Sequence, residues 1–139
     1  MDVQETLSII KPDAMKLKYS GKIIYFIEEK SFTIIAQKKI VLTKSQAEAF
    51  YSVHKERPFF HELVEFMISG PILVQIIEAK GAVSYYREVM GSTNPDEAKE
   101  GTIRKLYGTN IQCNAVHGSD SIENAHAETS FFFSKLEMI

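Results

Sequence analysis

Three stretches of the chain are rich in β-branched and other apolar residues and predict β-strands, over residues 6–10, 32–41 and 72–77. The second stretch alternates in part between apolar and polar positions, which is typical of a strand with one wetter face. Residues 114–117, which Gly118 follows, form a fourth and shorter candidate strand. The pattern therefore predicts a small sheet whose strands are widely separated in the chain.

Between these stretches the apolar residues recur at helical spacing, three or four positions apart. Thr43 and Gln46 form a capping box at the start of one predicted helix, and Asp120 with Glu123 caps the last one. The predicted helices cover residues 21–30, 43–55, 59–68, 82–90 and 120–132.

The resulting element order predicts an α+β fold. A β-α-β-β-α-β order favours a ferredoxin-like βαββαβ sandwich, with a four-stranded antiparallel sheet covered by helices on one face. Residues 91–113 carry no regular pattern, and so long a connection in a small protein is often functional. No repeat or linker divides the 139 residues, so we expect residues 1–139 to form one domain.

Composition and charge narrow the class of protein. The 16 basic and 18 acidic side chains give a net charge of −2, which argues against generic binding to nucleic acid or to anionic membranes. No segment has the ~20 apolar residues needed to span a bilayer, and the N-terminus lacks a secretory signal pattern. A single cysteine, Cys113, is consistent with a reducing compartment. We therefore expect a cytoplasmic protein.

Of the four histidines, His117 has the most suggestive context. It falls where a short strand ends and Gly118-Ser119-Asp120 leads into a helix, beside free backbone N–H groups. A histidine that merely closes a turn is the simpler alternative. Zinc-protease spacing fails because Glu65 follows His61-Glu62, and no serine-hydrolase elbow is present.

Phosphate binding is a further candidate chemistry, although the chain has no glycine-rich phosphate loop. Lys11 ends an apolar strand, Arg87 lies on a helix, and Arg104 lies in the irregular region. Each cation alone is more often a solvated surface charge. A polyphosphate site would need these side chains and hydroxyls such as Thr93 to converge, which spacing cannot show.

Five motifs, in order, resemble the nucleoside diphosphate kinase family. Residues 114–120, Asn-Ala-Val-His-Gly-Ser-Asp, are similar to the family's active-site motif N-x-x-H-G-S-D. Glu128 follows His117 by eleven residues, where the family has a glutamate that supports the histidine. The other matching segments are Ile-Lys-Pro-Asp-Ala at 10–14, Arg-Pro-Phe-Phe at 57–60, Gly-Ser-Thr-Asn-Pro at 91–95 and Gly-Thr-Ile-Arg at 101–104.

The resemblance implies that a terminal phosphoryl group passes from a nucleoside triphosphate, usually ATP, to a nucleoside diphosphate, which maintains nucleoside triphosphate pools. The transfer would be ping-pong, through a phosphohistidine on Nδ1 of His117. It assigns Ser119 and Glu128 to ordering the histidine and Tyr51 to the neighbourhood of the phosphates. The remaining implied contacts are Lys11, Arg87, Thr93 and Arg104 to phosphates, Lys11 and Asn114 to ribose, and Phe59, Leu63 and Ile111 to the base.

The resemblance also implies the cofactor and the assembly. Mg²⁺ would bridge the nucleotide's phosphates with few or no protein ligands, as its preference for phosphate oxygens and water allows. The sequence ends at Ile139 without the longer C-terminal tail of many eukaryotic relatives, which takes part in subunit contacts. We expect a homo-oligomer, a hexamer or alternatively a tetramer.

Two other classes of function stay open from the sequence. A ferredoxin-like module that binds nucleotides or a partner without catalysis need not keep the nucleophile and its cations together. A nucleic-acid-binding regulator has little support from an isoelectric point near 6.1. Lys105-Leu106 departs from the family pattern, in which an acidic residue often follows the loop arginine.

Overall fold

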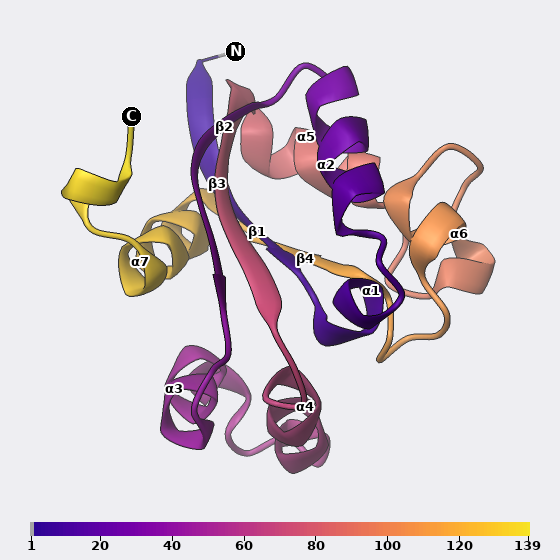
Figure 1. The fold of residues 1–139 in the computed structure, drawn as a ribbon, viewed down its shortest axis with the longest axis vertical. Coiled ribbons are helices and arrows are strands. Elements are labelled where there is room, and N and C mark those ends of the chain that lie inside the picture. The colour runs from indigo at the N-terminus through magenta and orange to yellow at the C-terminus, as the bar shows by residue number, and fades with distance from the viewer. Residues whose placement is uncertain (1) are drawn as a thin grey trace.

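The computed structural model describes residues 2–139 and contains a four-stranded antiparallel sheet. Its strands are β1 (Val3–Ile10), β2 (Thr33–Ile40), β3 (Ile72–Lys80) and β4 (Val116–Gly118), in the order β2-β3-β1-β4 (Figure 1). β1 pairs with β3 along its whole length, from Val3 opposite Lys80 to Ile10 opposite Leu73. The predicted α+β class and antiparallel sheet are confirmed.

Helices make up most of the chain between the strands. The 3-10 turns are η1 (Ser52–His54), η2 (Pro95–Glu97) and η3 (Lys135–Glu137). The α-helices are α1 (Pro12–Lys16), α2 (Ser20–Glu29), α3 (Lys44–Phe50), α4 (Phe60–Met67), α5 (Ala82–Met90), α6 (Ile103–Tyr107) and α7 (Ile122–Phe132).

Helices pack on both faces of the sheet, so the prediction that they cover one face was wrong. Leu7 and Ile9 of β1 belong to a buried apolar cluster with α3, α4 and the end of α7. Ile10 and Ile77 belong to a second cluster, with α2 and α5. Because the central strands β1 and β3 are buried on both faces, each face needs an apolar cover. Figure 1 shows α2 and α5 on one side of the sheet and α7 on the other.

Three local predictions differ from the structure. α3 ends at Phe50, and the continuation predicted to residue 55 is the separate turn η1. α7 is capped by the Ser121 side chain, which accepts a hydrogen bond from the Asn124 N–H, because Asp120 lies one position too early. The region predicted to be irregular, residues 91–113, contains η2 and α6, which are too short to give a sequence pattern.

Gly118 allows α5 to approach β4 closely. A Cβ atom at this position would lie 2.8 Å from the Tyr86 ring and 2.7 Å from the Met90 methyl group. The Tyr86 hydroxyl lies 2.9 Å from Ser8 Oγ, and Ser8 is the cross-strand partner of Gly118. α5 is thus fixed against β4, which contains His117, and against β1, which Lys11 follows directly. No helix in residues 2–139 is long and apolar enough to cross a membrane.

Candidate active site

His117 lies in β4 directly opposite Ile9 of β1. Because cross-strand partners share a face, its imidazole points to the face covered by α3 and α7. There its Nε2 lies 2.8 Å from Oε1 of Glu128, on α7. A carboxylate accepts, so Nε2 carries the proton of the neutral ring and the lone pair lies on Nδ1. The side chain remains 21% exposed, which leaves room for a reactant.

Ser119 fixes the same carboxylate oxygen. Its buried hydroxyl donates to Oε1 of Glu128 at 2.7 Å. Glu128 therefore holds two groups from the β4–α7 segment, and its own rotamer is restrained by both. This arrangement places the carboxylate where it can balance a positive charge that develops on the imidazole.

Two consecutive aromatic residues at the end of α3, Phe50 and Tyr51, lie near the pair formed by His117 and Glu128. The ring of Phe50 packs edge-on to His117, with 5.6 Å between ring centroids. The Tyr51 hydroxyl is buried and has no hydrogen-bond partner among the described residues. Burial and the negative charge of Glu128 raise the pKa of Tyr51, so the hydroxyl stays protonated. Tyr51 is thus a free hydrogen-bond donor near the histidine.

Lys11 and Asn114 form a short polar chain beside the histidine strand. Lys11 Nζ donates to Oδ1 of Asn114 at 2.9 Å, and Asn114 Nδ2 donates to the carbonyl of Thr93 at 3.0 Å. Burial, together with the nearby charge of Arg104, lowers the pKa of Lys11 to about 8. The ammonium therefore lacks a full counter-charge, which favours an anionic ligand.

Arg104 is buried and donates to two backbone carbonyls, Nη1 to Gly91 at 3.0 Å and Nη2 to Val116 at 3.0 Å. Its Nε has no partner among the described residues. Burial lowers the pKa of Arg104 to about 10, so the guanidinium stays charged at neutral pH. Arg104 joins the loop after α5 to the strand of His117 and keeps its Nε donor unpaired among the described residues.

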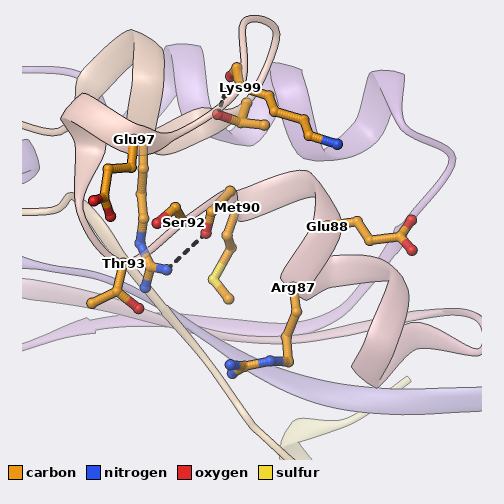
Figure 2. A pocket seen from close by; sticks show the side chains of 10 residues that line it. Arg87, Glu88, Met90, Ser92, Thr93, Glu97 and Lys99 are labelled. Carbon is orange, nitrogen blue, oxygen red and sulfur yellow. Dashed lines mark hydrogen bonds between the residues drawn. The ribbon is translucent and has the colours of Figure 1, made fainter.

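A cavity of about 700 Å³ lies on the outer side of this cluster. In Figure 2 the Arg87 guanidinium extends from α5 toward the side on which Thr93 lies, and Lys99 reaches the opposite rim. The cavity is lined by Arg87, Glu88, Met90, Gly91, Ser92, Thr93, Glu97, Lys99, Thr102 and Arg104. It therefore collects three of the cations and hydroxyls that the sequence analysis named separately.

The residues predicted to contact the base lie on more open surfaces. Phe59, just before α4, is 47% exposed, and Ile111 is 60% exposed. Leu63, on α4, is half-buried and packs against the apolar cluster that contains Leu7 and Ile9 of β1. Gln112, next to Ile111, lines a cavity with residues of α4, which places the two segments side by side.

Histidine, cysteine, aspartate and glutamate side chains of residues 2–139 form no group of three that could hold a metal ion. Glu88 and Glu97 line the cavity together with the cationic Arg87, Lys99 and Arg104.

The family model described as "Nucleoside diphosphate kinase" matches residues 4–138. The chain belongs to the nucleoside diphosphate kinase family. A family member from Persephonella marina is 57% identical over 139 residues, which cover 100% of this chain and 99% of the relative.

Two solved structures of the family have the same fold. The Aquifex aeolicus nucleoside diphosphate kinase superposes with a TM-score of 0.95 at 46% identity, covering 99% of this chain and 100% of that one. A halophilic nucleoside diphosphate kinase from Halobacterium salinarum, solved in complex with CDP, gives 0.94 at 31% identity. That match covers 99% of this chain and 92% of the other.

The structure places the predicted residues of this family member in several groups. His117, Ser119 and Glu128 share hydrogen bonds, Lys11, Asn114 and Thr93 form a second group, and Arg87, Thr93 and Arg104 line the cavity. The cavity lining includes neither His117 nor the residues predicted to contact the base, Phe59, Leu63 and Ile111. Two residues near them were missed from the sequence as parts of the site: Phe50, which packs on His117, and Asp13, which bonds the backbone N–H of Ala115. Asp13 lies in the 10–14 motif, two residues after Lys11, and Phe50 directly precedes Tyr51. Their closeness in the chain to these predicted site residues is the signal that could have found both.

Proposed function

We propose that this nucleoside diphosphate kinase transfers the terminal phosphoryl group through a phosphohistidine at Nδ1 of His117. The hydrogen bond between Nε2 and Glu128, 2.8 Å long, supports this proposal most directly. It leaves the lone pair on the nitrogen that faces away from the carboxylate. It also places a negative charge beside the ring that becomes positive during attack.

Each half of the reaction exchanges one bond for another. Nδ1 attacks the γ-phosphorus of the triphosphate; a P–N bond forms as the bond to the β–γ bridging oxygen breaks, and the electron pair leaves with the diphosphate. A second diphosphate then attacks the phosphohistidine through its terminal oxygen and breaks the P–N bond. Glu128 keeps the Nε2 proton in place throughout, so the ring regains its starting form.

The cations of the site would neutralise the negative charge that spreads over the phosphate oxygens. Phosphoryl transfer depends on alignment and on neutralising those oxygens. Arg87, Thr93 and Arg104 line the cavity, and Lys11 is linked to Thr93 through Asn114. The unpaired hydroxyl of Tyr51 and the free Nε of Arg104 are donors ready for a phosphate or ribose oxygen.

The base would stack on Phe59, with Leu63 and Ile111 as additional walls. A stacking contact accepts any base, because every base has a π face. Mg²⁺, carried on the phosphates, would neutralise part of their charge. The nucleotide rather than the protein would supply most of its ligands, since Mg²⁺ prefers phosphate oxygens and water.

The decisive experiment labels the protein with [γ-³²P]ATP. Wild-type protein should take up acid-labile, alkali-stable label and pass it to a nucleoside diphosphate. His117→Ala should abolish both steps. His126→Ala is the matched control, because His126 is an exposed histidine in mid-α7 and should leave both unchanged. Full transfer by a folded His117→Ala protein would overturn the proposed mechanism.

The same measurement separates catalysis from simple nucleotide binding. A non-catalytic nucleotide-binding module would bind the nucleotide and show no exchange of label. The contacts among His117, Glu128 and Ser119 favour the enzyme, because a binding module has no use for an oriented imidazole.

We also propose that the protein acts in the cytoplasm as a homo-oligomer, a hexamer or alternatively a tetramer. The long loop of residues 91–113 packs with few regular elements of its own, and subunit contacts would stabilise it. Sedimentation equilibrium distinguishes the two assemblies by mass. A monomer at micromolar concentration would contradict the proposal.

A further inference from the structure

Ala115, two residues before His117, has an unusual backbone. Its φ is +75°, in the left-handed region that residues other than glycine rarely occupy. The Val116 N–H donates to the carbonyl of Asn114 at 2.9 Å and closes a three-residue turn around Ala115. A turn of this kind with positive φ is rare and strained, so contacts elsewhere must hold it.

Both polar backbone groups of Ala115 are held by the segment after β1. The Ala115 N–H donates to Oδ2 of Asp13 at 3.1 Å, and the Lys11 N–H donates to the Ala115 carbonyl at 2.8 Å. Ala115 itself is fully buried. Asp13 contributes the one side chain among these contacts, and we call these two hydrogen bonds the Ala115 clamp.

The turn separates residues that the proposed mechanism uses. Asn114, on one side, bonds Lys11 Nζ and the Thr93 carbonyl. Val116, on the other side, accepts from Arg104 and leads directly to His117. If Ala115 relaxed to an ordinary φ, Asn114 and Val116 could no longer keep both sets of bonds. The Ala115 clamp therefore fixes the spacing between Asn114, which the resemblance assigns to the ribose, and the nucleophile His117.

Asp13 also lies in the first turn of α1, so a helix-stabilising role is the simpler alternative. That role does not account for the whole side chain. The carboxylate lies near the backbone N–H groups of Asp13 and Ala14, but its Oδ1 is buried without a partner among the described residues, a cost that an exposed helix-terminal aspartate avoids. Its Oδ2 also spans 102 residues of sequence to reach the Ala115 N–H.

We infer that Asp13 is a positioning residue for phosphoryl transfer, acting through the left-handed turn at Ala115 that it clamps. The inference rests on the proposed transfer through His117. It assigns a role to a carboxylate that touches neither the cavity lining nor His117.

The test measures the rate of phosphohistidine formation in single turnovers with ATP. Asp13→Leu removes the acceptor and should slow this step by roughly 100-fold, because small displacements of reacting groups have effects of that size. The KM for ATP should change much less. Asp13→Asn keeps a carbonyl oxygen for the Ala115 N–H and should stay within about threefold of wild type.

A second substitution tests the turn itself. Ala115→Gly removes the steric penalty of positive φ, so the turn needs less support. The double variant Asp13→Leu, Ala115→Gly should recover at least tenfold of the lost rate, which a role in α1 alone would not produce. Glu123→Leu is the matched control, because it removes an exposed acidic residue from the first turn of α7 and should leave the rate unchanged.

The outcomes are distinct. Absence of label on wild-type His117 would refute the proposed function. Normal wild-type labelling with an equally fast, folded Asp13→Leu variant, or no rescue by Ala115→Gly, would refute the role of Asp13 alone. If Asp13→Leu does not fold, Asp13→Ser replaces it in the same comparison, since its polar side chain suits a helix start but its hydroxyl is one bond shorter.

Discussion

The proposed phosphate side and the proposed base side of the site are built differently. On the phosphate side, Lys11, Arg104 and Asn114 donate hydrogen bonds to other protein groups before any nucleotide arrives. On the base side, Phe59 and Ile111 are exposed apolar side chains. The proposed site therefore fixes what all nucleotides share and leaves open what differs among them.

The physical reason lies in what each end must recognise. Donors that are already oriented stabilise charged phosphate oxygens more strongly, because no reorganisation is then needed during the reaction. A base offers an apolar face that any flat side chain can cover. A site of this design trades selectivity among bases for precision at the phosphorus.

The largest effect is expected from breaking the phosphate side at Arg104. Arg104→Leu removes a buried charge that lines the cavity and should lower kcat by about 10²–10³-fold, the usual effect of losing one such donor. Steady-state transfer assays measure it. Lys105→Leu is the matched control because its side chain is exposed. A loss below tenfold in folded Arg104→Leu would show that the phosphate side is less preorganised than its hydrogen bonds indicate.

An intermediate effect is expected from pH, through Lys11. Its lowered pKa of about 8 means that the ammonium is charged below pH 8 and neutral above it. Since a neutral amine binds phosphate poorly, kcat/KM for ATP should fall as pH rises through 8, approaching tenfold per pH unit. Arg104 lowers the pKa of Lys11, whereas Asp13 and Cys113 raise it.

Lys11→Arg provides the control for this pH profile. A guanidinium stays charged over the whole range, so the decline above pH 8 should disappear even where the absolute rate is lower. A wild-type profile that stays flat to pH 9.5 would contradict the assignment. The residues of the base side should not affect the pH profile of the wild type or of Lys11→Arg. The pH dependence therefore reports on the phosphate side alone.

The smallest effect is expected at the base side. Phe59→Ala should raise KM by about fivefold, the lower end of a stacking contribution, because the ring is half-exposed. kcat should stay unchanged, and ATP, GTP and CTP should be affected alike. Tyr25→Ala removes an exposed aromatic side chain of α2 and serves as the control. A large effect for one base only would mean that the base side is selective.

The sequence predicted the sheet and most helices because their apolar runs are long. The residues around His117 predicted a strand end followed by a capped helix, and the structure contains both, β4 and α7, although Ser121 and not Asp120 is the cap. The sequence did not predict that helices cover both faces of the sheet. Which apolar residues of β1 and β3 share a face becomes known only with the register of the two strands. The contact of Asp13 with Ala115 joins segments 102 residues apart, and no local pattern reports it.

The pairing of β1 with β4 has a consequence for folding kinetics. The histidine strand has three residues, and Asn114, just before it, is bonded to Lys11 across 103 residues of chain. Closing so long a loop costs entropy before the contacts repay it, so such pairings form late. Helices and the β1–β3 pair can therefore be in place while the molecule is still inactive. On refolding, phosphoryl transfer should return after the helical signal has recovered.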